Sequence, residues 1–281
     1  HAHDSNITMR ANDPEFKERP NLHGQFNGKM GVYSYRDNKD MSARESLSVA
    51  WHEMYHMHQY SHGLKSTSIR AEKDYSPKDI FLTKMVMEIS AFTFDKIMMH
   101  RYHLAGAPGM KDAEKQDLKD YVQEFSDFYQ LQIKEGVKPQ EAEKITAQAM
   151  FRFHVQSAIF QEIRGTYVRR LAPQQNEMME PATDALKISD LQKLAEIPGS
   201  YSFLPPEFSI ADFNKQMLQD LQQNWTNYIG QEKKAASKTS DPGTQQSPAV
   251  KPQTAQICYS GPEEEIQKIN RIVQDKIKQG L

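Results

Sequence analysis

The chain of 281 residues contains a single cysteine, Cys258, so no disulfide can form within it. It also lacks an apolar run long enough to cross a membrane. Charge of one sign is missing as well, because 35 basic and 37 acidic side chains leave a formal charge of −2 and no dense basic run. Such a chain has no field that attracts nucleic acid or acidic membranes. We therefore expect a soluble globular protein with no membrane span and no nucleic-acid partner.

The most informative pattern that is present is His52-Glu53-Met54-Tyr55-His56, an HExxH sequence. In an α-helix, residues i and i+4 differ by about 40° around the axis, so His52 and His56 leave the same face. Two neutral imidazoles on adjacent turns can bind one Zn²⁺. Glu53, about 100° from His52, can reach the attacking water without being a ligand. The motif predicts His52 and His56 as zinc ligands and Glu53 as the general base.

The surroundings of the motif indicate a helix that meets a core. Ser42 followed by Glu45 forms a capping box and places the helix start just before the motif. Apolar side chains recur at the spacing of a half-buried helix: Leu47, Ala50, Trp51, Met54 and Tyr55. The competing interpretation is a surface helix that carries three nearby histidines by accident. The apolar stripe favours the metal site.

A catalytic zinc usually has three protein ligands and one open position, so a third ligand is needed. The stretch HEMYHMHQYSH nearly has the metzincin spacing, in which a third histidine follows a glycine. Gln59 stands where that pattern has Gly, and His62 stands last. Gln59 cannot easily make the turn that Gly makes, so this route to a third ligand is disfavoured.

Glu88 is the better candidate for the third ligand. It lies in a predicted second helix, on a face shared with Phe81, Met85, Phe92, Asp95 and Met99. A carboxylate within a largely apolar face is costly unless a cation compensates it, and a divalent metal does so. The alternatives are a pair with Lys84 or His100, or a face turned to a wet groove.

The segment from about Gly31 to Asp95 resembles small, uncharacterised bacterial HExxH metallopeptidases. Their pattern is a short Tyr-containing strand, a helix of the type LxHExxHxxQ, and a second helix with a Glu followed by small residues. The matching residues are Gly31-Val32-Tyr33, then His52, Glu53, His56 and Gln59, then Glu88 with Ser90 and Ala91. The layout is also similar to that of gluzincins. The resemblance implies a zincin-like fold, Zn²⁺ and peptide-bond hydrolysis.

Two positions depart from these patterns. The gluzincin sequence ExxxD has Asp at the position of Phe92, and the smaller family tends to have an acidic residue at the position of Ser90. A ligating imidazole normally donates its second N–H to a carboxylate or a carbonyl. Asp95 or a backbone carbonyl is expected to serve here.

Helical patterns dominate from Ser42 onward, so we expect a mainly α protein: a zincin-like helical domain with a short β-strand or hairpin before the HExxH helix. Residues 1–29 are rich in Asn, Asp, Pro and Gly and are expected to be irregular. Met30–Tyr35 is the only predicted strand, and it is a candidate to pair with extended substrate. The predicted helices cover residues 42–62, 78–103, 111–135, 139–170, 187–196 and 210–234.

In this organisation the helical metallopeptidase-like domain spans residues 30–232. A flexible linker at 233–261 has few apolar side chains and many Ser, Thr, Gln and Pro. Residues 262–281 form an amphipathic helix, which is expected to dock on the body or on a partner chain.

The sequence therefore predicts a zinc-dependent hydrolase, most simply a metallopeptidase that cleaves a peptide or protein substrate. Gluzincins often use a His or Tyr from a later helix to stabilise the oxyanion, and His154 and Tyr167 are candidates. His100 and His103 end a helix, where a structural role is the default. Two other classes stay open: a non-catalytic helical binding or effector protein with a structural zinc site, and a metal-free scaffold. A bacterial cytoplasmic and an exported location both fit.

Overall fold

The computed structural model describes residues 8–11, 24–27, 32–35, 41–60, 76–171, 175–179, 186–197 and 199–237. Within these ranges the protein is mainly helical, as predicted. The chain divides into two units, residues 1–235 and 236–281, and the site considered below lies wholly in the first. The remainder of the predicted linker, the terminal helix at 262–281, Cys258 and His62 lie outside the described residues.

A three-stranded sheet precedes the first described helix. Its strands are β1 (Thr8–Ala11), β2 (Gly24–Asn27) and β3 (Val32–Tyr35), in the order β1-β3-β2. β3 confirms the strand predicted at 30–35, but it is central, with β1 parallel on one side and β2 antiparallel on the other. Both edges of β3 are thus occupied, so it cannot bind substrate by backbone pairing. The expectation of an irregular segment at 1–29 is wrong at β1 and β2, which pair with a partner distant in sequence.

Two long helices carry the functional motifs, and both begin at capping boxes. α2 (Ala43–Gln59) starts after Ser42, whose hydroxyl accepts from the Glu45 amide while the Glu45 carboxylate accepts from the Ser42 amide. α4 (Pro77–Leu104) starts after Ser76, which forms the same reciprocal pair with Asp79. Such caps satisfy N–H groups that have no partner within the helix. Both starts agree with the predicted boundaries to within a residue or so.

The helices predicted at 111–135 and 139–170 are each divided in two. Val122 (φ −97°, ψ 5°) separates α5 (Asp112–Tyr121) from α6 (Gln123–Lys134). Ser157 is extended (φ −73°, ψ 153°) and separates α7 (Pro139–Gln156) from α8 (Ala158–Leu171). Its hydroxyl lies 3.4 Å from the Phe160 amide, the position of an N-cap. Ser157, a residue type that favours the N-cap position, was thus the feature of the sequence that could have predicted the break between α7 and α8.

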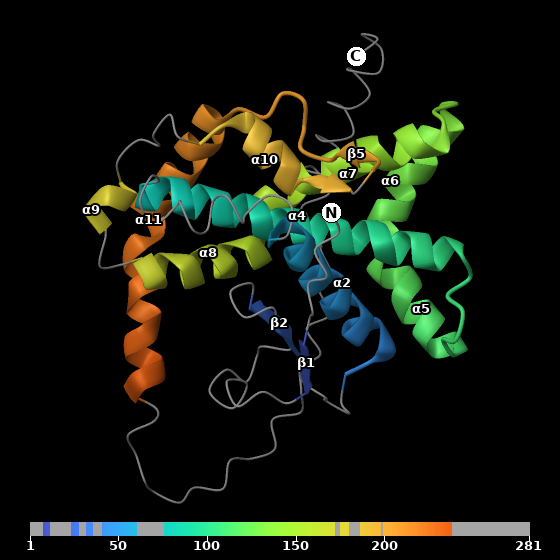
Figure 1. Ribbon diagram of the computed structural model, residues 1–281, viewed down its shortest axis with the longest axis horizontal. Coiled ribbons are helices and arrows are strands. Elements are labelled where there is room, and N and C mark those ends of the chain that lie inside the picture. Colours follow the sequence, from blue (N-terminus) through green and yellow to red (C-terminus); the bar gives the residue numbers. More distant parts are fainter. Residues whose placement is uncertain are drawn as a thin grey trace, which may run out of the picture. The chain divides into compact units, whose positions relative to one another are not determined.

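The remaining elements follow α8 in the chain. They are α9 (Gln175–Met178), α10 (Ile188–Leu194), β4 (Glu196–Ile197), β5 (Tyr201–Ser202) and α11 (Ile210–Ser237). β4 and β5 pair as a small antiparallel ribbon (Figure 1). The ribbon begins directly after α10, and α10 itself contacts α4.

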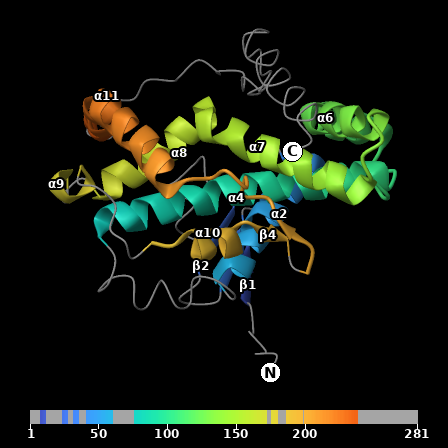
Figure 2. The same cartoon turned by 90° about the horizontal axis from the view of Figure 1, so that it is seen from above.

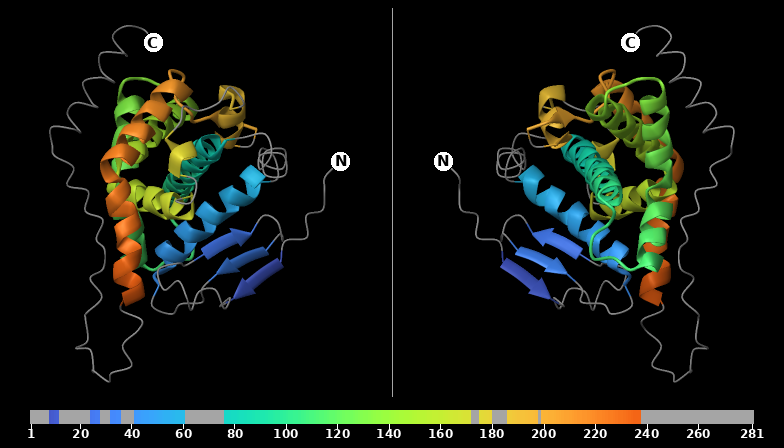
Figure 3. Two further views of the ribbon diagram at one scale, coloured as in Figure 1. Left: turned by 90° about the vertical axis from the view of Figure 1, so that its left-hand side faces the viewer. Right: turned by 90° about the vertical axis from the view of Figure 1, so that its right-hand side faces the viewer.

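α4 is the centre of the first unit. It contacts α2, α5, α6, α7, α8, α9 and α10, and it lies between α2 and α7 (Figure 2). Five of its large apolar side chains are fully buried: Phe81, Leu82, Met85, Ile89 and Ile97. The sheet, α2 and α4 follow one another as layers, with β2 against α2 (Figure 3). Within the described ranges, no helix combines the length and apolar character needed to cross a bilayer.

Candidate metal centre

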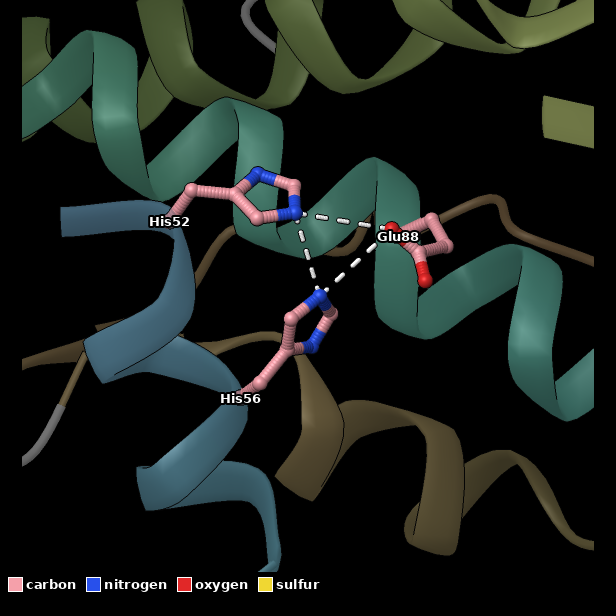
Figure 4. Close-up of side chains that lie close together, drawn as sticks. All are labelled: His52, His56 and Glu88. Carbon is pink, nitrogen blue, oxygen red and sulfur yellow. Dashed lines mark hydrogen bonds and ion pairs between the residues drawn. The ribbon is translucent and has the colours of Figure 1, made fainter. Parts of the chain in front are cut away.

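The side chains of His52, His56 and Glu88 converge between α2 and α4 (Figure 4). Nε2 of His56 lies 3.1 Å from Nε2 of His52. Oε2 of Glu88 lies 3.5 Å from Nε2 of His52 and 3.4 Å from Nε2 of His56. One oxygen and two ring nitrogens therefore form a nearly equilateral triangle. The three side chains are half-buried, with 14–17% of their surface exposed.

The triangle arises because α2 and α4 run antiparallel along their contact. Ser48 near the start of α2 meets Asp95, whereas Gln59 at its end meets the backbone at Met87. The HExxH spacing places both histidines on the face of α2 that meets α4. Glu88 lies opposite them, as the sequence predicted for the third ligand.

The charges of the three groups are strongly coupled. Burial by itself would lower the pKa of His56, but the adjacent Glu88 carboxylate outweighs it and raises the pKa to about 9. Burial would likewise raise the pKa of Glu88, but the two imidazoles hold it well below its usual range. Glu88 is consequently an anion between two imidazole nitrogens. A bound cation would be stabilised by the same negative charge.

The donor set fits zinc in kind and in spacing. Zn²⁺ binds imidazole nitrogen and carboxylate oxygen at about 2.0–2.2 Å in a tetrahedron, which sets the donors about 3.3 Å apart. The three separations in the triangle are 3.1, 3.4 and 3.5 Å. Among the described residues, this is the one group of three or more His, Cys, Asp or Glu side chains that could hold a metal ion. Three donors from the described residues leave the fourth tetrahedral position open.

His56 is held from its other ring nitrogen by Gln59. Nδ1 of His56 lies 2.9 Å from Oε1 of Gln59. The amide nitrogen of Gln59 donates to the carbonyl oxygens of Met87 and Leu194, at 3.2 and 3.0 Å. Gln59 is fully buried. The sequence had marked Gln59 as part of the family-like pattern and as a poor substitute for Gly, but not as the partner of His56.

His52 has a different environment, and among the described residues no hydrogen bond joins it to Asp95, the carboxylate expected as its partner. Its ring lies edge-on to Phe92, with the centroids 4.5 Å apart, at the position where the gluzincin pattern has Asp. Asp95 instead accepts hydrogen bonds from Ser48 (2.8 Å) and Tyr121 (2.5 Å) through Oδ2. Burial raises the pKa of Asp95, while these two donors oppose that rise. Asp95 thus ties α2, α4 and α5 together next to the site.

Tyr167 of α8 reaches the cluster. Its hydroxyl donates to Oε1 of Glu88 at 2.7 Å, the carboxylate oxygen that does not face the histidines. His154, the other candidate, lies against Phe92 with the ring centroids 6.1 Å apart. Its Nε2 is buried and has no hydrogen-bond partner among the described residues, and burial lowers its pKa to about 3. Of the two candidates, Tyr167 is the residue that touches a predicted ligand.

The other residues singled out in the sequence lie outside the group of three converging donors. Glu53 is half-buried, is not one of the three converging donors, and lies near enough to His56 for its charge to raise that pKa. Met54 was expected in the buried stripe but is 48% exposed.

His100 is buried against Phe125 and Tyr129, so the alternative pair with Glu88 does not form. Burial lowers the pKa of His100 to about 4, so it is neutral and not a cation at the helix end.

Comparisons of the chain with family models, curated proteins and solved structures gave no match. The interpretation of the site consequently depends on its own geometry and chemistry.

Proposed function

We propose that the protein is a zinc-dependent hydrolase, and specifically a metallopeptidase, with His52, His56 and Glu88 as the zinc ligands. The observation that carries the proposal is the near-equilateral triangle of two Nε2 atoms and one carboxylate oxygen with sides of 3.1–3.5 Å. These sides are close to the donor spacing of about 3.3 Å in a tetrahedral zinc site. Structural zinc sites are usually closed by four protein ligands, so a set of three favours catalysis over a structural role.

Each residue has a definite task in this proposal. Bound zinc would supply a water of lowered pKa and a Lewis acid that polarises the scissile carbonyl. Glu53, one residue after His52 and outside the ligand set, would accept a proton from the attacking water and pass it to the leaving amine. Glu88 would supply negative charge to the centre, and Tyr167 would hold its second oxygen.

The proposal is tested with a denatured protein as substrate and Glu53→Gln as the decisive variant. Glu53→Gln should bind zinc like the wild type but lose on the order of 10²-fold or more in turnover, because only the base is removed. His52→Ala should lose both zinc and turnover. If the wild type binds zinc but hydrolyses nothing, the proposed hydrolase activity is contradicted and the alternative of a non-catalytic binding protein is supported. Equal loss of zinc in both variants would contradict the separate roles of Glu53 and His52.

A further inference from the structure

Gln59 uses both ends of its amide in the protein interior. Its NH₂ group donates to two backbone carbonyl oxygens, that of Met87 at 3.2 Å in α4 and that of Leu194 at 3.0 Å at the end of α10. Its Oε1 lies 2.9 Å from Nδ1 of His56. The side chain is fully buried, so each of these atoms depends on its protein partner.

These contacts determine where the proton of His56 lies. A carbonyl oxygen can only accept, so the group of Gln59 that faces Met87 and Leu194 must be the NH₂ donor. The group that faces His56 is then the amide oxygen, which also can only accept. Nδ1 of His56 must therefore carry the hydrogen. In the neutral ring this leaves the lone pair on Nε2, the atom that faces His52 and Glu88.

We propose that Gln59 is a positioning residue, which fixes the tautomer and ring orientation of His56 so that Nε2 is the metal-binding atom. The inference rests on the proposed zinc site and adds to it the element that prepares one ligand. Such partners of ligating histidines typically account for a 10- to 100-fold effect on metal affinity. The Gln59 amide links the His56 ring to the backbone of both α4 and α10.

A purely structural role for Gln59 makes a different prediction, and Tyr55 provides the matched control. Tyr55 is buried on the same helix, and its hydroxyl donates to the same Leu194 oxygen at 2.8 Å and to the Glu196 oxygen at 3.2 Å. Tyr55→Phe removes an anchor between α2 and the end of α10 but leaves the His56–Gln59 contact in place. If anchoring is all that matters, Tyr55→Phe and a Gln59 variant should have equal effects on zinc.

The test measures Zn²⁺ affinity of the full chain by competition with a chromophoric chelator. Gln59→Leu should weaken affinity roughly 10- to 100-fold, because nothing then accepts the Nδ1 hydrogen. Gln59→Glu keeps an oxygen that can accept from Nδ1 but loses the NH₂ that donates to the Met87 and Leu194 carbonyls, so it should retain more affinity than Gln59→Leu while its thermal stability falls. Tyr55→Phe should bind zinc like the wild type even where its thermal stability falls. Unchanged affinity in Gln59→Leu, or an equal loss in Tyr55→Phe, would overturn the proposal.

A second readout separates this inference from the proposed function. Imidazole ¹H–¹⁵N NMR of the metal-free protein should show a slowly exchanging Nδ1 hydrogen on His56 in the wild type and in Tyr55→Phe, and its loss in Gln59→Leu. If the wild type bound no zinc but kept this signal, the metallopeptidase would be contradicted and the positioning of His56 would stand. If the signal were unaffected by Gln59→Leu, the positioning role would be contradicted whatever the zinc affinity.

Discussion

Tyr167 donates a 2.7 Å hydrogen bond to Oε1 of Glu88, while Oε2 of the same carboxylate faces the two imidazoles. The two oxygens of Glu88 therefore have separate partners. One is held by a hydroxyl from α8, and the other is directed to the place where a cation would lie. A carboxylate fixed at one oxygen has fewer orientations to lose when the other binds metal.

Removing the hydroxyl in Tyr167→Phe should weaken zinc binding by about tenfold, at the lower end of what partners of metal ligands contribute. The measurement is the apparent Kd for Zn²⁺ from chelator competition. Tyr102→Phe is the control, because its hydroxyl bonds to the Pro108 carbonyl near the far end of α4. An affinity in Tyr167→Phe equal to that of the control would contradict the role assigned to Tyr167.

Zinc should stabilise the folded protein, since a ligand that binds only the native state raises its free energy of unfolding. Free zinc at about 100 times its Kd should contribute about 2.7 kcal/mol. For a protein of this size that corresponds to roughly 5–10 °C in Tm. Thermal denaturation with and without a chelator measures the difference.

His52→Ala controls for effects of the chelator elsewhere, and its Tm should be the same with and without chelator. A metal-free scaffold, in which the HExxH pattern is accidental, predicts no change in the wild type either. That outcome would contradict zinc binding by the native state.

The buried, neutral His100 should make the protein less stable in acid. Burial lowers its folded-state pKa to about 4 from the usual histidine value of 6.5. The Glu143 carboxylate opposes this shift, and the charges of His103 and Arg101 add to it. The unfolded chain therefore binds a proton first as the pH falls below 6.5. Stability is complete above that value and is lost towards the folded pKa. Between pH 6.5 and 4.5 the loss from this one group should be about 2 kcal/mol.

Urea unfolding of the wild type and of His100→Gln at both pH values measures that contribution. Glutamine does not titrate, so the fall in stability should be smaller in His100→Gln by the amount that His100 contributes. Carboxylates contribute equally to both proteins and cancel in the comparison. A fall of the same size in both would show that His100 is not the titrating group.

The sequence predicted the parts of the site that depend on local periodicity. HExxH places His52 and His56 on one face of α2 through helix geometry alone. Glu88 was marked by its cost within an apolar face of α4, and it lies opposite the histidines in the structure. Gln59 is three residues after His56, so its contact with the ring was available from helical spacing.

Contacts between segments that are distant in sequence could not be predicted, because they produce no local periodicity. Tyr167 was a candidate to stabilise the oxyanion, but it is 79 residues from Glu88 and no sequence pattern predicted the hydrogen bond between them. β1 and β2 are short and pair with β3 across the chain, so their own residues show no strand signal. Met54 follows the spacing of the apolar stripe, yet its side chain is 48% exposed. Tertiary packing, and not helix periodicity, decides these positions.

The central claim is that His52, His56 and Glu88 bind one zinc ion, and elemental analysis of the purified chain tests it most directly. The wild type should contain about one zinc per molecule, as expected for a single tetrahedral site. His52→Ala and Glu88→Ala, purified in parallel, should contain none. Retention of zinc in Glu88→Ala would show that the third ligand is another residue. A wild type that takes up no zinc even after incubation with the metal would contradict the account.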